Sequence, residues 1–279
     1  MKTVNRRFRF AVLIIGALLV AGTALHARKI PVDQVRVTTP VYTPELADFN
    51  PPKGLYGYSV SWNGIPAGSI ELKVERDGPN YKITADARTA KGIDILYKLR
   101  YHSEAVLSAD TLLPRESTYI SHENSRRKIT RLNFLPNGEI QSVREDRHGK
   151  IESMRFQADN FTLDPYSAGF LALSLEWKVG DTRRFDTFTG KSRYLIELTA
   201  TERTRIVVNG KTREAFVIVP NITKLTESEP EKKMRGAKIY ISADNSREIL
   251  EIVSDLFFGS VKTKMDSFTA HSAAATPTP

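Results

Sequence analysis

Apolar and polar side chains alternate over long stretches of this chain, and this period of two restricts its possible folds more than any other feature. Residues 70–75 and 81–88 show it most clearly, with apolar side chains at every second position. Because successive side chains of a strand point to opposite faces, each stretch predicts a strand with one buried and one solvated face. Antiparallel sheets tolerate such strands, whereas parallel sheets covered by helices bury both faces. The pattern therefore predicts a mainly β protein with antiparallel strands.

Turn-forming dipeptides divide the alternating stretches and predict tight hairpins between them. Asn-Gly and Asp-Gly supply the positive φ angles that short hairpin turns require. Four such pairs lie between strand-like segments: Asn63-Gly64, Asp77-Gly78, Asn137-Gly138 and Asn209-Gly210. Further strands are predicted over residues 115–121, 128–134, 139–144, 151–156, 183–186, 193–202, 205–208, 214–220, 238–242, 249–254 and 261–268. Since strands joined by short turns tend to be neighbours, we expect one long antiparallel meander.

One segment breaks the alternation and predicts a helix. Asp164 and Pro165 supply a helix N-cap and a proline at the first helical position, and the run continues to Trp177. Apolar residues surround most of its circumference, which is typical of a buried helix. We therefore expect the meander to curl into a barrel- or spiral-like sheet around this buried apolar helix. A second, short helix is predicted over residues 92–99, where it would cover an open end of the sheet.

The two ends of the chain differ from the sheet-forming part. Residues 1–27 combine four cations with a 16-residue apolar run, a pattern typical of a secretory signal peptide. The run is shorter than the roughly 20 residues that span a bilayer, so we expect cleavage and no stable membrane span afterwards. An uncleaved signal anchor is the alternative. Residues 28–53 predict a Pro-rich linker, 54–269 a single β-rich domain, and 270–279 a disordered tail.

Cysteine is absent and histidine is scarce, which excludes several kinds of site. Without cysteine the chain has no thiol nucleophile, thiolate metal site, disulfide or lipid-modified lipoprotein cysteine. No two of the five histidines have a metal-ligand spacing. We therefore expect neither a metal nor another cofactor.

The charge pattern argues against nucleic acid as a partner. The formal net charge is +9, and removal of residues 1–27, which carry four cations and no acid, lowers it to +5. Cations and acids are interleaved along the rest of the chain, and the densest basic cluster is Arg126-Arg127-Lys128. A nucleic-acid-binding protein gathers its cations on one face or stripe. We interpret these charges as a slightly basic, solvated surface.

Motifs for phosphate binding and nucleophilic catalysis are incomplete. The segments 190–192 and 210–212 end like a phosphate-binding loop, but each lacks the first glycine and the following helix. Ser121, His122 and Glu123 are neighbours on a strand, so their side chains alternate between faces and do not form a triad together. A catalytic site assembled from residues far apart in the sequence is an alternative that these motifs do not exclude. These patterns favour a protein without enzymatic activity.

Aromatic residues supply the only positive indication of a binding site. They recur on one face of the first strand and along one side of the predicted helix. One interpretation is that they build the core, as aromatic side chains often do. The other is that they line a cavity between helix and sheet, where small inward residues such as Ala85 and Ala87 leave room for an acyl chain. The predicted ligand-lining residues are Tyr58, Trp62, Tyr166, Phe170 and Trp177.

Several motifs, taken in order, give the chain a resemblance to a known family. They are YSVSWNGIPAG at 58–68, YKITA at 81–85, TLLP at 111–114, LDPYSA at 163–168, ISAD at 241–244 and FGSV at 258–261. Their order and spacing over residues 55–268 resemble the bacterial family known as domain of unknown function 3108. The resemblance implies an exported envelope protein of Gram-negative bacteria, with a sheet-rich fold akin to periplasmic β-spiral and lipoprotein-carrier-like proteins. It supplies no catalytic residues.

Together these observations predict a non-enzymatic periplasmic protein of the cell envelope. We expect it to bind an amphiphilic, lipid-like ligand or an envelope protein partner in a concave sheet, and to support envelope integrity. The alternatives are a polysaccharide-binding protein or a hydrolase that acts on envelope polymers. A third possibility is a scaffold whose interior is filled.

Overall fold

The structure, a computed structural model, describes residues 29–47, 49–158, 161–226, 236–256 and 259–271. The predicted signal peptide, residues 1–27, lies outside the described residues. The predicted tail lies outside them from residue 272 onward, whereas Ala270 belongs to the last strand.

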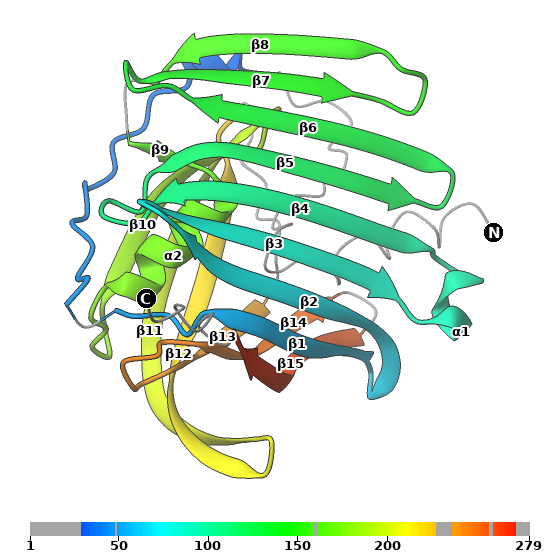
Figure 1. Cartoon of the computed structure of the whole chain (residues 1–279), viewed down its shortest axis with the longest axis vertical. Helices are drawn as coiled ribbons and strands as arrows, with labels where there is room; N and C mark the ends of the chain where they lie inside the picture. The colour runs from blue at the N-terminus through cyan, green and yellow to red at the C-terminus, as the bar shows by residue number, and fades with distance from the viewer. Residues whose placement is uncertain (1–28, 48, 159–160, 227–235, 257–258, 272–279) are drawn as a thin grey trace, which may run out of the picture.

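Within the described residues, fifteen strands form one large sheet (Figure 1). The first half of the chain supplies β1 (Gly54–Trp62), β2 (Ile65–Asp77), β3 (Asn80–Thr89), α1 (Lys91–Asp94), β4 (Leu99–Ser108), β5 (Pro114–Glu123), β6 (Arg126–Phe134), β7 (Glu139–Glu145) and β8 (Ile151–Gln157). The second half supplies β9 (Thr162–Leu163), α2 (Pro165–Ser174), β10 (Thr182–Phe188), β11 (Arg193–Val208), β12 (Lys211–Lys224), β13 (Gly236–Ser242), β14 (Ile249–Leu256) and β15 (Gly259–Ala270). The predicted mainly β fold is confirmed.

The sheet is a meander in which the first and last strands meet in the middle. β1 to β8 follow one another outward on one side, and β15 to β9 do so on the other. β1 and β15 pair antiparallel, for example with Tyr58 opposite Met265. The described strand pairs are antiparallel except β9 and β10, which are parallel and joined through α2. The edge strands β8 and β9 do not pair with each other, so the sheet is open rather than a closed barrel.

The four predicted hairpin turns are confirmed. Asn63 and Gly64 join β1 to β2 with φ angles of 48° and 81°, and Asn209 and Gly210 join β11 to β12 with φ angles of 53° and 72°. Two successive positive φ angles match the twist of paired strands, which explains the choice of Asn-Gly. The two remaining pairs join β2 to β3 and β6 to β7.

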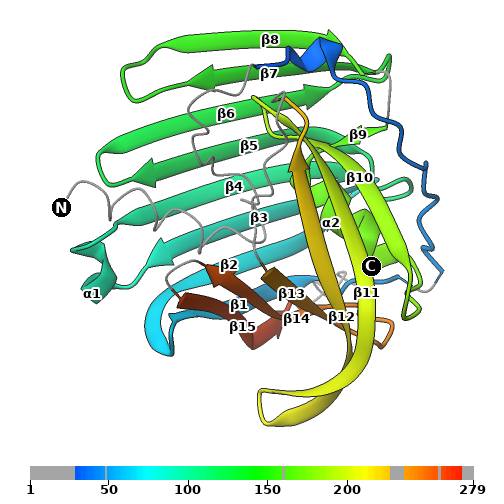
Figure 2. The ribbon, with the colours of Figure 1, turned by 180° about the vertical axis from the view of Figure 1, so that it is seen from behind.

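The second half of the sheet lies behind the first, with α2 between the two layers (Figures 1 and 2). Seven of the ten α2 residues are buried, and the five apolar ones among them belong to two clusters of the core. Tyr166 and Phe170 pack against β1 to β4, whereas Ala168 and Leu171 pack with residues of β10 and β11. Since α2 contacts apolar side chains on both sides, an apolar circumference suits its position.

Side-chain contacts, rather than hydrogen bonds between strand backbones, connect the two layers of the sheet near its edge strands. Phe156 of β8 makes a T-shaped contact with Phe188 of β10, with ring centroids 5.1 Å apart. The Ser142 hydroxyl of β7 donates a 2.7 Å hydrogen bond to the Gly190 carbonyl in the β10–β11 turn. These contacts join the two layers without closing the hydrogen-bonded ladder.

The predicted helix over residues 92–99 is reduced to the single turn α1, and that prediction was wrong in extent. Leu99 already belongs to β4. Ile93 and Tyr97 are buried, but Leu96 is 60% exposed, so the expected continuous apolar face does not form. The longer helix begins as predicted at Asp164 but ends at Ser174 rather than continuing to Trp177.

Residues 29–47 and 49–53, which we name the strap, contain one short 3-10 helix, η3 (Val32–Gln34), and pack along the sheet. Val32, Val35 and Phe49 are buried. The backbone N–H of Arg184 in β10 donates to the Tyr42 hydroxyl at 2.9 Å. β9 pairs with β10 at only two residues, which leaves other backbone groups on that edge of β10 without a strand partner. The strap supplies a hydrogen-bond partner to one of them.

A buried ion pair connects the strap to the sheet. The side chains of Arg193 and Asp186 are 2% and 0% exposed, and the guanidinium contacts both carboxylate oxygens. Arg193 also donates to the carbonyls of Val32 and Val35, at 3.4 and 3.1 Å. Thr162 donates to Asp186 at 2.6 Å. The two buried charges are thus paired and hydrogen-bonded, which offsets the cost of removing them from water.

Candidate functional site

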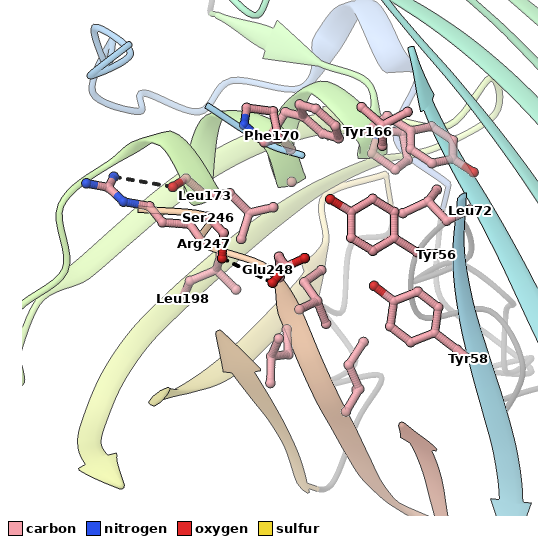
Figure 3. A pocket seen from close by; sticks show the side chains of 18 of the residues that line it. Tyr56, Tyr58, Leu72, Tyr166, Phe170, Leu173, Leu198, Ser246, Arg247 and Glu248 are labelled. Carbon is pink, nitrogen blue, oxygen red and sulfur yellow. Dashed lines mark hydrogen bonds between the residues drawn. The ribbon is translucent and has the colours of Figure 1, made fainter. Parts of the chain in front are cut away.

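An apolar cavity of about 130 Å³ lies next to α2, between the two halves of the sheet (Figure 3). β1 and β2 contribute Tyr58 and Leu72, α2 contributes Phe170, and β11 and β14 contribute Leu198 and Ile252. Polar groups gather at one side, in the turn between β13 and β14. The cavity therefore has apolar walls and a polar rim.

A buried carboxylate positions the N-terminal end of α2. Asp164 is 0% exposed and its side chain accepts a 2.7 Å hydrogen bond from the Ser167 backbone N–H, as an N-cap does. The same carboxylate accepts hydrogen bonds from the hydroxyls of Ser117 at 2.5 Å and Tyr119 at 3.0 Å. Both hydroxyls come from β5. The cap therefore fixes α2 against the first half of the sheet.

The first turn of α2 also makes a second polar contact with the sheet. The Tyr166 hydroxyl hydrogen-bonds with the Ser103 hydroxyl of β4. Its ring stacks on Tyr119 at 6.3 Å between centroids. Burial raises the pKa of Tyr166 well above its ordinary value, so the hydroxyl stays protonated. The wall formed by α2 is held by polar contacts at one end and apolar packing along its length.

Arg247 holds the other end of α2. It lies in the β13–β14 turn, residues 243–248, and donates hydrogen bonds to the carbonyls of Leu173 and Ser174 at 3.3 and 2.6 Å. The last carbonyls of a helix have no partner within the helix, and a cation there also complements the helix dipole. Figure 3 shows Arg247 reaching from the rim of the cavity to this helix end.

A second arginine fixes the same turn. Arg213 of β12 donates to Asp244 at 2.7 Å and to Glu248 at 2.6 Å. Partial burial alone would raise the pKa of Asp244, but hydrogen bonds from Ser246, Arg213 and Ser242 lower it to about 2. The Glu248 side chain is only 8% exposed. The polar rim is thus a rigid, hydrogen-bonded turn with paired charges.

Two tyrosine hydroxyls face the rim from β1, as Figure 3 shows. The Tyr56 hydroxyl donates to the Pro52 carbonyl at 2.7 Å. Tyr58 is 3% exposed, and its hydroxyl makes no hydrogen bond within the described part of the chain. Burial and then the Glu248 carboxylate raise the pKa of Tyr58 well above its ordinary value. Tyr58 therefore presents a protonated hydroxyl to the rim of the cavity.

The structure brings three of the five predicted ligand-lining residues together. Tyr58, Tyr166 and Phe170 all line the cavity. Trp62 lies at the far end of β1, half buried against the core. Trp177 follows α2 and is buried in the second core cluster, where its indole N–H donates to the Ala172 carbonyl at 2.9 Å.

Neither the polar rim nor the glycine of α2 was predicted from the sequence. Arg247 and Glu248 come from a turn, and no local pattern marks a turn as neighbour to a helix some seventy residues earlier. Gly169 lines the cavity, and a Cβ atom placed on it would meet no heavy atom within 4 Å. A glycine within an otherwise apolar helix could have signalled a close approach or a space.

A separate, polar depression of about 400 Å³ lies on the outer face of β2 to β5. It is lined by two histidines, His102 and His122. His102 lies 2.9 Å from a carboxylate oxygen of Asp86. Both partners are substantially exposed, so the pair is weakened by solvent.

The chemistry of the cavity suits binding. Among the described residues that line it, Glu248 is the one carboxylate, and it is neutralised by Arg213. Glycoside hydrolysis uses two facing carboxylates, which this lining does not present. Among the described residues, no group of three or more His, Cys, Asp or Glu side chains is placed to hold a metal ion.

A comparison with known protein families shows to which family the chain is related. The model of the family described as "Protein of unknown function (DUF3108)" matches residues 57–266, which include most of the sheet and the cavity. The chain belongs to this family. The resemblance of its motifs to DUF3108 is thereby confirmed. No curated protein matches this DUF3108 chain.

Solved structures show that the DUF3108 fold has distant relatives. A beta-barrel-like protein of DUF1849 from Brucella abortus is 8% identical, with a TM-score of 0.53, covering 80% of this chain and 98% of that one. This likeness supports a barrel-like fold. A protein from Bacteroides fragilis described as exported and YmcC-like in fold, and one from Parabacteroides distasonis described as a lipoprotein, have TM-scores of 0.35 and 0.33 at 8% identity. They cover 79% and 82% of this chain, and 98% and 100% of their own.

Membrane-spanning helices are a further feature by which a chain can be classified. The described part of this DUF3108 chain holds no helix with the length and apolar character that a membrane crossing requires.

Proposed function

We propose that this protein is a non-enzymatic component of the bacterial cell envelope that holds the apolar chain of an amphiphile next to α2. The observation that carries the proposal is an apolar cavity with a polar rim, which the Tyr58 hydroxyl faces without a hydrogen-bond partner among the described residues. In this account the sheet curls around α2, and α2 forms one wall of the binding site. The ligand head group lies at the rim, near Arg247 and Glu248.

The size of the cavity favours a single chain. At about 130 Å³ it is close to the cavity of about 150 Å³ that admits one benzene ring in an engineered protein. Pockets that enclose a drug-sized ligand measure about 300–1,000 Å³. The site therefore suits the end of one acyl or similar chain rather than a complete two-chain lipid.

An envelope location agrees with the N-terminal sequence. Residues 1–27 have the charge and hydropathy pattern of an export signal. A protein exported to the periplasm meets amphiphiles continually, because it works between lipid surfaces. Neither a cofactor nor nucleic acid has a part in this proposal.

Filling the cavity from α2 tests the proposal. In Gly169→Leu the new side chain starts in open space, and the loss of a helical glycine favours the helix by up to about 1 kcal/mol. We expect the variant to remain folded and to bind a fluorescent single-chain fatty acid at least about tenfold more weakly, since a few lost apolar contacts have this effect. Fluorescence titration measures the affinity, and thermal unfolding checks the fold.

Gly92→Leu is the matched control. Gly92 is a helical glycine in α1, a Cβ atom there also meets no heavy atom within 4 Å, and it does not line the cavity. The affinity of Gly92→Leu for the fluorescent fatty acid should equal that of the wild type. Equal binding by Gly169→Leu and Gly92→Leu would refute the cavity as the site, and binding of glycan fragments alone would favour the polysaccharide alternative.

The same titration with Tyr58→Phe separates the contribution of the ligand head group to the affinity from that of the ligand's apolar chain. The substitution removes a hydroxyl that has no hydrogen-bond partner among the described residues, so stability should change little. Affinity should fall about two- to tenfold if the hydroxyl donates to the ligand, as one hydrogen bond is worth about 0.5–1.5 kcal/mol.

A further inference from the structure

Four connections of the first half of the chain lie at one end of the sheet, on the right in Figure 1. They are the turns β1–β2, β3–β4, β5–β6 and β7–β8, and we name residues 63–65, 91–98, 124–128 and 146–151 the hairpin end. Large aliphatic side chains project there into solvent: Ile65 is 57%, Ile95 87%, Leu96 60% and Ile151 64% exposed. They come from three different turns, so folding places them along the same end of the sheet without burying them.

Exposed cations lie at the same end of the sheet. Lys91 and Lys98 flank Ile95 and Leu96 in sequence, and the β5–β6 hairpin adds the Arg126-Arg127-Lys128 cluster. The backbone N–H of Lys98 donates to Asn124 at 2.9 Å, which places the β3–β4 and β5–β6 connections side by side. Within the described residues, no ion pair is formed by Lys91, Lys98, Arg126 or Lys128.

The acidic groups of the hairpin end are already engaged. Asp94 pairs with Arg100 at 2.5 Å, and hydrogen bonds from Arg100 and then Thr89 lower its pKa to about 2. Glu145, next to the hairpin end, lies 3.4 Å from Arg127. Asp146 accepts hydrogen bonds from the backbone N–H groups of His148 and Lys150. The charges left for an outside partner are therefore mainly positive.

We propose that the hairpin end docks the protein on an anionic lipid surface. Single aliphatic side chains on separate turns can enter the boundary between head groups and acyl chains, while lysines and arginines bind the anionic head groups. Trp62, half buried at the same end of β1, is of a residue type that favours this boundary. Charge complementarity selects an anionic bilayer as the partner.

This docking is independent of the proposed ligand site. The cavity uses Tyr56 and Tyr58 from the first half of β1, whereas the hairpin end begins after Trp62. A change at the hairpin end should therefore leave fatty-acid binding unaltered.

Vesicle co-sedimentation tests the docking surface, with the protein recovered from the periplasm of a Gram-negative host. The vesicles are phosphatidylcholine alone or phosphatidylcholine mixed with phosphatidylglycerol. We expect the wild type to bind only the anionic vesicles. Ile95→Ser with Leu96→Ser, and separately Lys91→Glu with Lys98→Glu, should each weaken that binding by about tenfold.

Val207→Ser with Lys211→Glu is the matched control at the β11–β12 turn. Val207 is 55% exposed and Lys211 is exposed, but neither belongs to the hairpin end. This control should bind like the wild type. The proposal is overturned if the wild type does not bind anionic vesicles or binds neutral vesicles equally well. It is also overturned if the hairpin-end variants bind anionic vesicles as well as the control does.

Discussion

Arg193→Met should lower the free energy of unfolding by about 3–5 kcal/mol, because removal of one partner leaves Asp186 as an unpaired buried charge. The same substitution removes the donors to the Val32 and Val35 carbonyls, so the strap should also loosen. Chemical denaturation measures the stability, and hydrogen exchange of the strap amides measures the loosening.

Arg184→Met is the matched control for this effect. Arg184 pairs with Glu197 at 2.7 Å on the surface, with its side chain 57% exposed. An exposed pair contributes about 0–1 kcal/mol, so the control should change stability little. If Arg193→Met destabilises no more than Arg184→Met, the buried pair does not anchor the strap. The double variant Arg193→Met with Asp186→Leu should recover part of the loss, since it leaves no unpaired charge.

Asp164→Ala should cost about 2–4 kcal/mol of unfolding free energy. Loss of the N-cap accounts for about 0.5–2 kcal/mol, and the rest comes from the buried hydroxyls of Ser117 and Tyr119, which lose their acceptor. Because α2 forms a wall of the cavity, fatty-acid affinity should fall together with stability. Denaturation and the fluorescence titration measure the two effects.

Asp146→Ala supplies the comparison for Asp164→Ala. Asp146 accepts two hydrogen bonds from backbone N–H groups, but it lies in an exposed surface turn where water can replace it. Its removal should cost less than about 1 kcal/mol and leave ligand binding intact. Ser117→Ala should cost less in the Asp164→Ala background than alone, because the two residues share one hydrogen bond. Additive costs would contradict the cluster.

Local patterns predicted the parts of the fold that local forces determine. The Asn63-Gly64 and Asn209-Gly210 turns need only their own φ angles, and the α2 N-cap needs only Asp164 and the residues after it. β4 was missed because its inward row contains a polar residue, Ser103, which interrupts the apolar alternation. Ser103 is buried because its hydroxyl meets Tyr166 of α2.

Features that depend on distant partners could not be predicted in the same way. The pairing of β1 with β15 and the packing of the strap arise from residues far apart in the chain. Of the predicted ligand-lining residues, Tyr58, Tyr166 and Phe170 share the cavity because α2 lies over the first half of β1. Trp62 is too far along that strand, and Trp177 comes after α2 has ended.

Native mass spectrometry of the wild type, purified from the periplasm without added lipid, addresses ligand occupancy most directly. We predict an additional mass of one single-chain amphiphile per protein, present in the wild type and Gly92→Leu and absent from Gly169→Leu. A wild-type spectrum that holds only the bare chain in repeated preparations, or an adduct that Gly169→Leu retains, would contradict the account.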